Sequence, residues 1–460
     1  MIKQTEPMPT ENGNDTPHLT MQEVSRASWS LSLGSALEYY DFALYSLASA
    51  LVFGPLFFPS SSPAMAIIKS FGTYFLGFAV RPIGGIIFGA LGDHIGRKKV
   101  LLITVTMMGI ASTLIGAIPT YQTIGLWAPA LLIFLRLVQG FGAGAEQAGA
   151  SVMMTEIAPI GRRGLSASLP YMGIQLGTVL AAIVYFLVIY NGDITQNSFL
   201  WRIPFLSSIF VVGVALLMRI KLKESPAFEA IKAKGKTERI FVPELVRRSW
   251  KPILVAIGLR YGDNGGSSIY QVLALSFMIN TVGMGTYFGP LALMIAAFVG
   301  AIIVPIAGLM SDKWGRVFTY RFFSLVLFFS AIPVWYSFTL GNPILSVIAL
   351  SVGLGCGAWG CFGAQGAMMA EMFGSGHRYL GVSFARELSA VVAGGITPLV
   401  GSLIIKWTID HSVSHTMSAG TGAWLWLGCY VMVMGAISYI ATLFLPEFAN
   451  RDLLDPKDVI

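Results

Sequence analysis

Nine ionisable residues lie inside long apolar runs of the sequence, where a charged side chain is expensive to place. They are five acids and four arginines: Glu38, Asp41, Arg81, Arg136, Glu146, Arg260, Asp263, Arg386 and Glu387. At the centre of a membrane helix each such residue costs about 2.5–3.5 kcal/mol on an insertion scale. We therefore expect these residues to face a water-filled cavity or one another. Neutralisation of the acids by the arginines is the simplest role, and proton transfer or the binding of an ionised solute is the functional alternative.

Two acids of the first apolar run have the spacing of a proton-binding site. Glu38 and Asp41 are three residues apart and Tyr45 follows four residues later, so a helix places all three on one face. A carboxylate changes its affinity for a proton when an arginine approaches or withdraws. We hypothesise that Asp41 is the principal proton carrier, that Arg136 is its partner, and that Glu38 is the alternative carrier. A permanent Asp41–Arg136 salt bridge is the competing interpretation.

Polar residues recur at helical spacing along several other apolar runs, which is typical of helices that line a water-filled path. A guanidinium group suits a carboxylate, so Arg260 and Arg386 favour an anionic substrate. Their neighbours Asp263 and Glu387 leave internal charge compensation equally open. The candidates for substrate binding on this basis are Tyr45, Gln139, Glu146, Tyr171, Gln175, Arg260, Asp263, Asn264, Gln271 and Arg386.

The composition indicates that these residues are carried by membrane helices. Only 12% of the 460 residues are charged and 55% are hydrophobic, whereas soluble domains carry about 25% charged residues. This excludes a soluble globule, a nucleic-acid-binding protein and a secreted disulfide scaffold. A membrane helix needs about 20 apolar residues, so the apolar runs predict an all-α, polytopic membrane protein. Twelve transmembrane helices are expected near residues 29–53, 68–92, 99–118, 125–150, 165–189, 200–220, 251–279, 287–310, 318–338, 344–371, 380–405 and 421–446.

The basic residues alternate sharply between the two sides of this arrangement. Of the 30 lysines and arginines, 23 fall in alternate loops and the two tails, and three fall in or beside the intervening loops. Because cytoplasmic loops collect Lys and Arg, both termini are expected in the cytoplasm, with the protein in a bacterial-type inner (plasma) membrane. The expected division is an N-terminal tail 1–28, a six-helix bundle 29–221, a linker 222–250, a second six-helix bundle 251–446 and a C-terminal tail 447–460.

A charged turn is repeated in the two halves. The segment GALGDHIGR (89–97) follows the second expected helix, and GLMSDKWGR (308–316) follows the eighth, 308 − 89 = 219 positions later. A second acid pair, Glu156 and Glu371, recurs at a similar offset. Glycine permits the sharp reversal, and an acid at a helix end can pair with an arginine or cap a neighbouring helix. The candidates for a cytoplasmic gate are Gly89, Asp93, Gly96, Arg97, Asp312, Gly315, Arg316, Glu156 and Glu371.

Several strings of the sequence resemble a known family. GALGDHIGRKK resembles the signature turn of the major facilitator superfamily, and RLVQG, which begins at Arg136, resembles its helix-four arginine motif. Four further strings are similar to the metabolite:proton symporter branch of that superfamily: EYYDF (38–42), RPIGG (81–85), WRIPF (201–205) and ESPAF (224–228).

The resemblance implies two pseudo-symmetric six-helix bundles and proton-coupled carriage of shikimate, α-ketoglutarate, citrate, or proline and betaine. It also implies a pore lined by the first and tenth helices, which adds Trp359 to the candidates for substrate binding. The second turn departs from the family pattern, because Val317 and Phe318 stand where the first turn has Lys98 and Lys99. We therefore expect the second copy to form the weaker gate contact.

These features together predict a secondary transporter and not an enzyme. The phosphate-binding loop GxxxxGK[ST] does not occur in the sequence, and no residue set suits a metal, so protons are the expected coupling ion and no cofactor is expected. We expect proton-coupled import, by alternating access, of a small polar metabolite, foremost an organic acid. A carrier of a zwitterionic osmolyte and a non-transporting membrane receptor are the alternatives. The expected partners are a small-molecule substrate and the lipid bilayer, with no nucleic acid and no obligate protein partner.

Overall fold

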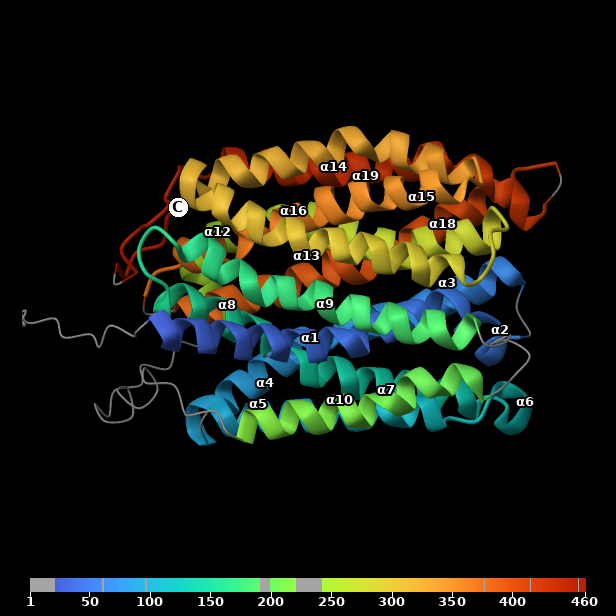
Figure 1. Cartoon of the computed structure of the whole chain (residues 1–460), viewed down its shortest axis with the longest axis horizontal. Helices are drawn as coiled ribbons and strands as arrows, with labels where there is room; N and C mark the ends of the chain where they lie inside the picture. The colour runs from blue at the N-terminus through green and yellow to red at the C-terminus, as the bar shows by residue number, and fades with distance from the viewer. Residues whose placement is uncertain are drawn as a thin grey trace, which may run out of the picture.

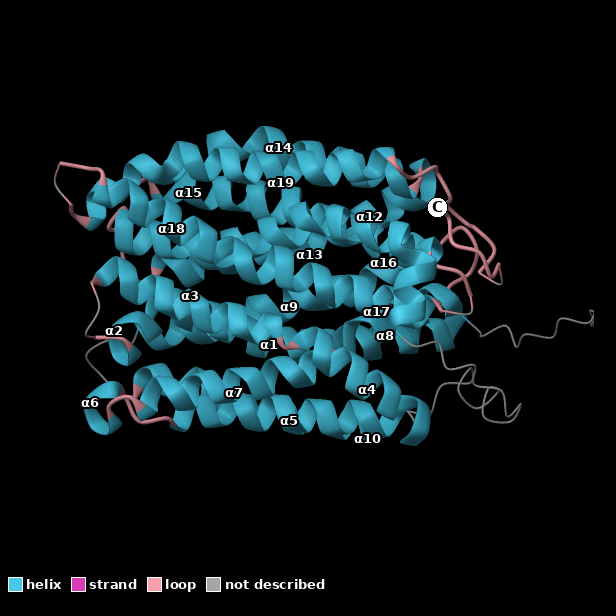
Figure 2. Ribbon diagram, turned by 180° about the vertical axis from the view of Figure 1, so that it is seen from behind, coloured by secondary structure: helices cyan, strands magenta, loops and turns pink. Residues whose placement is uncertain are grey.

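The computed structural model describes residues 21–59, 62–95, 97–144, 146–190, 199–220, 242–375, 377–413, 415–453 and 455–460. Within these ranges every regular element is a helix, and the long helices run roughly parallel to one axis (Figure 1; Figure 2). The all-α fold predicted from the apolar runs is confirmed. The C-terminal segment 444–460 lies at one end of the bundle, which we call the tail end, and the opposite end is the far end.

Six long helical segments form the described part of the first half, drawn blue to green in Figure 1. They are α1 (Met21–Leu51), α3 with α4 (Pro63–Ala79 and Arg81–Ile95), α5 (Arg97–Ala117), α7 with α8 (Trp127–Ala143 and Glu146–Ile157), α9 (Arg163–Tyr190) and α10 (Ile203–Ile220). Three short helices lie near the far end: α2 (Phe53–Phe57), α6 (Tyr121–Ile124) and η1 (Leu200–Arg202).

Six further segments form the described part of the second half, drawn yellow-green to red. Several of them contain π-helical turns, labelled η2 to η5. The segments are α12 (Val242–Ser268) with η2 (Ile269–Ala274) and η3 (Phe277–Thr281), α13 (Phe288–Trp314), α14 (Arg316–Thr339), α15 (Pro343–Leu350) with η4 (Ser351–Ala358) and α16 (Trp359–Met372), α17 (Arg378–Ser389) with η5 (Ala390–Gly395) and α18 (Ile396–Asp410), and η6 (Met417–Ala423) with α19 (Trp424–Leu443).

The surface of this bundle is that of a protein in lipid. Among the described residues, eight helical segments have the length and apolar composition needed to cross a bilayer, and two shorter apolar stretches, Leu102–Ala117 and Leu200–Val214, add to them. Large apolar side chains such as Phe134, Phe210 and Phe329 are at least 60% exposed, whereas the nine ionisable residues of the apolar runs are buried. An apolar outside around a polar inside is the arrangement that a bilayer requires.

Three helices begin at least five residues earlier than the apolar runs predict. α1 begins at Met21 and not at residue 29, because polar residues continue the helix beyond the apolar run. α3 begins at Pro63, where Ser62 caps the helix by accepting a backbone hydrogen bond (3.4 Å). α12 begins at Val242, inside the expected linker, and bends at Ser249 before its apolar part. Hydropathy marks only the membrane-embedded part of a helix, so the polar extensions of α1 and α12 escaped it, whereas the extension of α3 is apolar. The expected N-terminal tail up to residue 20 and the linker up to residue 241 lie outside the described residues.

The two halves meet along α9 and α13, which pack against each other over much of their length. Nearer the far end, α18 and η5 of the second half contact α3 of the first. Nearer the tail end, α17 contacts α4 and α8 (Figure 2). Side chains on α4, α8 and α9 therefore reach side chains on α17, and this contact region holds part of the candidate site.

Candidate functional site

Asp41 is buried on α1 and faces two other helices of the first half. Its Oδ1 accepts a hydrogen bond from Ser208 Oγ of α10 (2.6 Å). Ser112 of α5 also hydrogen-bonds the carboxyl group, and Ser112 Oγ accepts in turn from Gln139 Nε2 of α7 (2.7 Å). Gln139 Oε1 accepts from Arg136 Nη1 (2.5 Å). Two uncharged side chains therefore connect Asp41 to Arg136.

No ion pair joins Asp41 and Arg136 in the described part of the chain, so the salt bridge of the competing interpretation is not formed in this structure. Arg136 instead lies among aromatic rings: its guanidinium carbon is 3.9 Å from the centre of the Tyr45 ring, and two further rings lie within 5.4 Å. Such stacking is favourable for a guanidinium group. Gly77 makes the room, because a β-carbon there would overlap Arg136 Nε.

A chain of charged groups crosses from the first half to the second. Arg81 Nη2 of α4 lies 3.4 Å from Glu38 Oε1 of α1, and Arg81 Nε lies 3.7 Å from Glu387 Oε2 of α17. Glu387 Oε1 is 3.9 Å from Arg386 Nε, and Arg386 Nη1 donates a hydrogen bond to Tyr171 Oη of α9 (2.7 Å). All five side chains are buried. Glu38 thus has Arg81 as its arginine partner, and Arg386 has both a carboxylate and a hydroxyl beside it.

In the second half, Arg260 and Asp263 of α12 are connected through a third side chain. Arg260 Nη1 donates to Gln365 Oε1 of α16 (2.8 Å), and Gln365 Nε2 donates to Asp263 Oδ2. Tyr320 Oη of α14 donates to the same Oδ2 (2.6 Å), whereas Oδ1 has no hydrogen-bond partner among the described residues. Arg260 Nε donates to Ser389 Oγ (2.6 Å). Both partners of Arg260 are uncharged, so within the described ranges no direct ion pair neutralises this buried arginine.

The other substrate candidates lie outside these three clusters. Trp359 Nε1 and Gln271 Nε2 both donate to Ser267 Oγ (2.8 and 2.6 Å), so the structure brings this pair together. Neither end of the fully buried Gln175 amide is hydrogen-bonded within the part of the chain that the structure describes. Buried polar atoms are normally hydrogen-bonded, so the position of Gln175 is compatible with its predicted role in substrate binding. Glu146 and Gln175 are buried, and Asn264 is half-buried.

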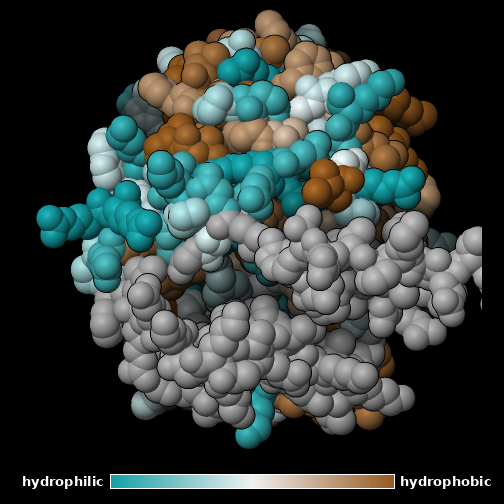
Figure 3. Space-filling model, turned by 90° about the vertical axis from the view of Figure 1, so that its left-hand side faces the viewer, coloured by the Kyte–Doolittle hydropathy of each residue, from teal (hydrophilic) through white to brown (hydrophobic). Residues whose placement is uncertain are grey.

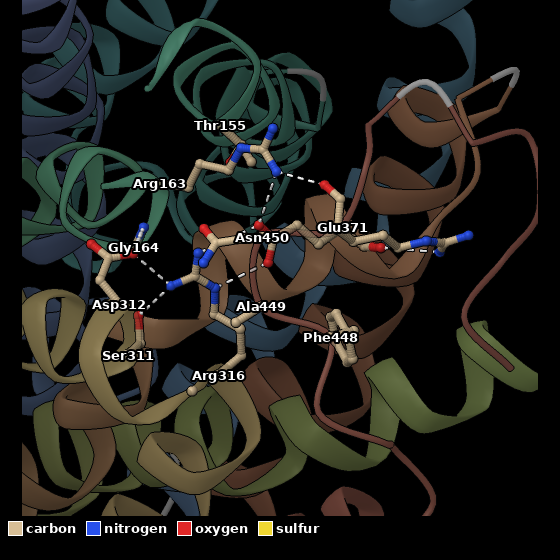
Figure 4. Close-up of polar contacts among 12 residues, drawn as sticks. Thr155, Arg163, Gly164, Ser311, Asp312, Arg316, Glu371, Phe448, Ala449 and Asn450 are labelled. Carbon is tan, nitrogen blue, oxygen red and sulfur yellow. Dashed lines mark hydrogen bonds and ion pairs between the residues drawn. The ribbon is translucent and has the colours of Figure 1, made fainter. Parts of the chain in front are cut away.

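At the tail end, the second copy of the repeated turn joins the two halves (Figure 4). The carboxylate of Asp312 accepts hydrogen bonds from the amides of Gly164 (2.7 Å) and Leu165 (2.9 Å), in the first turn of α9. Arg316 Nη1 lies 2.7 Å from Asp312 Oδ1, and Arg316 Nε lies 3.0 Å from Glu371 Oε2. A carboxylate at a helix N-terminus satisfies amides that the helix leaves unpaired. Asp312 therefore ties α13 of the second half to α9 of the first.

Two further ion pairs cross between the halves at the tail end. Arg163 Nη1 of α9 lies 3.5 Å from Glu371 Oε1, and Arg378 Nη1 of α17 lies 3.3 Å from Glu156 Oε1 of α8. Glu371 is buried between two arginines, one from each half. We call the buried part of this network the latch, which consists of Asp312, Arg316, Glu371 and Arg163.

The first copy of the turn is described only in part. Gly96 lies outside the described residues, and at Gly89, Asp93 and Arg97 only the backbone of α4 and α5 is described. In the second copy, Gly315 has a φ of 101° at the reversal between α13 and α14, a conformation that glycine adopts without strain. The expectation that the second copy forms the weaker contact stays a prediction.

Comparison with known proteins decides the family. A family model described as sugar (and other) transporter matches residues 28–242. The shikimate transporter of Escherichia coli (strain K12) is 35% identical to this chain over 416 residues, covering 88% of this chain and 94% of the relative. The proline/betaine transporter of the same organism is 31% identical over 450 residues, covering 94% and 85%. The chain belongs to the metabolite:proton symporter family of the major facilitator superfamily.

The fold of this facilitator agrees with that of a solved relative. The proton:xylose symporter XylE, in a structure bound to 6-bromo-6-deoxy-D-glucose, matches with a TM-score of 0.73, covering 95% of this chain and 99% of XylE at 17% identity. At that identity the likeness shows the fold alone, which is two bundles of six helices. The facilitator is therefore a multi-pass secondary transporter of metabolites in the inner membrane and not an enzyme. The family and the fold expected from the sequence are confirmed.

Removing the charge of Glu371 is expected to lower the stability of the facilitator strongly. Glu371→Gln takes a carboxylate away from both Arg316 and Arg163 in a buried place, and breaking a buried ion pair costs about 3–5 kcal/mol. The matched control is Glu156→Gln: the Glu156 side chain is 40% exposed in its pair with Arg378, so its loss costs about 1 kcal/mol or less. Thermal unfolding of both variants in detergent measures the difference. Equal losses would contradict a buried, stabilising latch.

The described part of the C-terminal segment, residues 444–453 and 455–460, packs beside the latch. Glu447 accepts hydrogen bonds from the first two amides of α14 (2.9 and 3.0 Å). Asp458 lies 2.6 Å from His377 Nε2 and accepts from Ser249 Oγ (2.6 Å). Burial alone would raise the pKa of Asp458, but these hydrogen bonds and one from a backbone amide outweigh it and hold the pKa below its usual range. An ionised Asp458 thus connects the segment to the second half. Hydrophilic residues gather on the described surface at this end of the molecule (Figure 3).

No sequence pattern marks the uncharged residues that connect the clusters, namely Ser112, Ser208, Tyr320, Gln365 and Ser389. Each is one of many polar residues in the apolar runs, and none has a charge or a repeated spacing that sets it apart. One contact did carry a usable signal. Tyr171 and Arg386 occupy equivalent repeat positions, because 386 − 171 = 215 equals the offset of the acid pair, 371 − 156 = 215. Residues at equivalent positions of two facing halves are natural candidates for a contact across the interface.

Proposed function

We propose that the facilitator imports a small organic anion together with protons. The observation that carries this proposal is the environment of Arg260, a buried guanidinium group whose hydrogen-bond partners Gln365 and Ser389 are uncharged. A buried charge is costly unless an opposite charge contacts it, and the nearby carboxylate of Asp263 reaches Arg260 only through Gln365. A substrate carboxylate would supply that counter-charge and would fit the planar fork of the guanidinium group. Arg386 is the weaker candidate, because Glu387 and Tyr171 already lie beside it.

Asp41 is our candidate for the principal proton carrier. Its hydrogen-bond donors Ser208 and Ser112 are uncharged, so a bound proton is the direct means of neutralising this carboxylate. Glu38, the alternative carrier, is already compensated by Arg81. The nine ionisable residues of the apolar runs are five acids and four arginines. One bound proton therefore makes their total charge zero.

We infer that the tail end faces the cytoplasm, because the loops at that end hold most of the basic residues. Both termini would then be cytoplasmic, with bundles 29–221 and 251–446 joined by the linker 222–250. In alternating access the latch would be closed while the substrate path is shut towards the cytoplasm. Opening on that side requires that Asp312 leave the α9 amides and that Glu371 leave Arg163.

One observation favours a zwitterionic substrate as the second candidate. Asp263 Oδ1 has no hydrogen-bond partner among the described residues, and the same carboxylate is connected to Arg260 through Gln365. A solute with a carboxylate and a cationic group would pair with both residues. A proline/betaine transporter is among the relatives of this chain, as is a shikimate transporter.

Uptake into proteoliposomes tests both candidates. The purified facilitator is reconstituted and supplied with labelled shikimate or labelled glycine betaine, with and without a pH gradient that is acidic outside. We expect accumulation of the acid only when the gradient is present. Gradient-dependent accumulation of betaine alone would favour the zwitterion, and downhill movement of either solute that ignores the gradient would overturn proton coupling.

A further inference from the structure

The last stretch of the chain, residues 450–460, lies along the tail end and forms no helix in its described part (Figure 1). We call it the strap. Its final residues are fastened to the second half. The amide of Val459 donates to Met372 O of α16 (3.1 Å). Asp458 Oδ1 accepts from the amide of Gly374 (2.9 Å), in addition to the bonds of Asp458 described above. The end of the strap is therefore joined to the second half.

The beginning of the strap contacts the first half. The amide of Gly161, in the turn between α8 and α9, donates to Asn450 Oδ1 (2.9 Å). Arg163 Nη1, in the first turn of α9, donates to Arg451 O (2.6 Å). Asn450 has a φ of 63°, a left-handed conformation that asparagine adopts more readily than most residues. The strap therefore bridges the two halves at the same end of the molecule as the latch.

The strap also contacts two residues of the latch. Arg163 Nη1, the atom that donates to Arg451 O, is the one that pairs with Glu371 Oε1 (3.5 Å). Arg451 Nη1 donates in turn to the backbone oxygen of Glu371 (3.3 Å). A buried guanidinium group needs acceptors for its N–H donors, and the strap supplies one of them to the buried Arg163. The strap therefore helps to hold Arg163 beside Glu371.

The two ends of the strap respond differently when the halves part at the tail end. The bonds of Asp458 and Val459 join the strap to the half that carries it, so they persist. The bonds from Gly161 and Arg163 join opposite halves, so they must break. These two bonds therefore stabilise only the closed arrangement, and an interaction made in one conformation alone shifts the equilibrium towards it.

We propose that the strap is a regulatory restraint that favours the conformation with a closed tail end. The inference rests on the alternating access proposed above and adds an element that sets its conformational equilibrium. None of the contacts named in the preceding paragraphs involves a candidate for substrate or proton binding. The strap therefore controls how readily the tail end opens and not which solute the facilitator binds.

Spin-label distances across the tail end test the strap without a solute. Lys99, near the start of α5, and Lys313, near the end of α13, are exposed and belong to opposite halves. Both are replaced by spin-labelled cysteines in protein whose native cysteines are replaced by alanine. Pulsed electron paramagnetic resonance of this protein in nanodiscs then gives the ratio of molecules with an open tail end to molecules with a closed one.

Removing the strap is expected to raise this ratio. Truncation after Ala449 should raise it about tenfold, because the lost bond from Arg163 has a charged donor. Asn450→Gly keeps the left-handed turn and removes only the bond from Gly161, which lies at the surface, so a rise of about threefold is expected.

Lys457→Gln is the matched control within the strap, because Lys457 is exposed and its backbone bonds remain. It should leave the ratio unchanged, whereas Asp312→Asn, which weakens the latch itself, shows that the labels detect opening.

An unchanged ratio in the truncated protein, or an equal rise for Lys457→Gln, would overturn the restraint. If truncation prevents folding, an unchanged ratio for Asn450→Gly overturns it. A closed tail end in every variant, Asp312→Asn included, would refute the proposed opening at this end and the restraint with it. Because neither a solute nor a pH gradient is present, failure of the proposed substrate or proton coupling leaves these outcomes unaffected.

Discussion

Replacing Asp41 by asparagine is expected to abolish accumulation driven by a pH gradient while leaving exchange of substrate across the membrane intact. Asparagine has nearly the same size and keeps an acceptor for Ser208, but it neither binds nor releases a proton. One pH unit corresponds to about 1.4 kcal/mol, or a tenfold concentration ratio for one proton per solute. For a gradient of one pH unit we therefore expect the accumulation ratio to fall from about 10 to about 1. Labelled uptake measures this ratio, and counterflow in the same proteoliposomes measures the exchange.

Glu38→Gln is the matched control for Asp41→Asn. It removes the other acid of the same α1 face, which already has Arg81 beside it. If Glu38→Gln abolishes gradient-driven accumulation and Asp41→Asn does not, the two assignments must be exchanged. If each variant halves the effect, the two carboxylates titrate as a coupled pair, and a single principal carrier is refuted.

Replacing Arg260 by alanine is expected to weaken substrate binding more than any other single change in the second half. The variant removes the guanidinium group that we assign to the substrate carboxylate. A hydrogen bond to a charged group contributes about 1.5–3 kcal/mol, so the transport KM should rise about 10- to 100-fold. Arg260→Lys keeps the charge but not the planar fork, so an intermediate KM is expected. Initial uptake rates over a range of solute concentrations, at matched protein content, give these values.

Arg386→Ala separates substrate binding from charge compensation. Arg386 is also buried, but it lies beside Glu387 and donates to Tyr171. We expect its loss to lower the thermal unfolding temperature, because Glu387 loses a partner in a buried place, with a smaller change in KM than Arg260→Ala gives. A large rise in KM for Arg386→Ala together with unchanged kinetics for Arg260→Ala would reassign the substrate carboxylate from Arg260 to Arg386.

The membrane segments and the sites of the gate residues were predictable because they depend on patterns that one sequence contains. A transmembrane helix is marked by its apolar length, and the turn at 308–316 by its acid, glycine and arginine together with its repeat. The polar ends of helices were not predictable in this way, as the start of α12 at Val242 illustrates. Outside the membrane a helix needs no apolar run, so hydropathy does not mark its first residue.

The partners inside the clusters were not predictable because they depend on the rotation of each helix. Asp41 points towards Ser208 and Ser112 and not directly at Arg136, and a difference of one residue in register turns a helix by about 100°.

The shared position of Arg81 has a consequence for how freely the halves can part. Arg81 lies between Glu38 of its own half and Glu387 of the other, and Glu387 keeps Arg386 beside it. When the 3.7 Å bridge between Arg81 and Glu387 lengthens, each half withdraws with an acid and a base of its own. Neither half then holds a buried charge without an opposite charge beside it. The electrostatic energy of this interface therefore changes little as the halves rotate. The charged groups at this interface thus allow the halves to rotate at little electrostatic cost, whereas the ion pairs of the latch must break before the tail end can open.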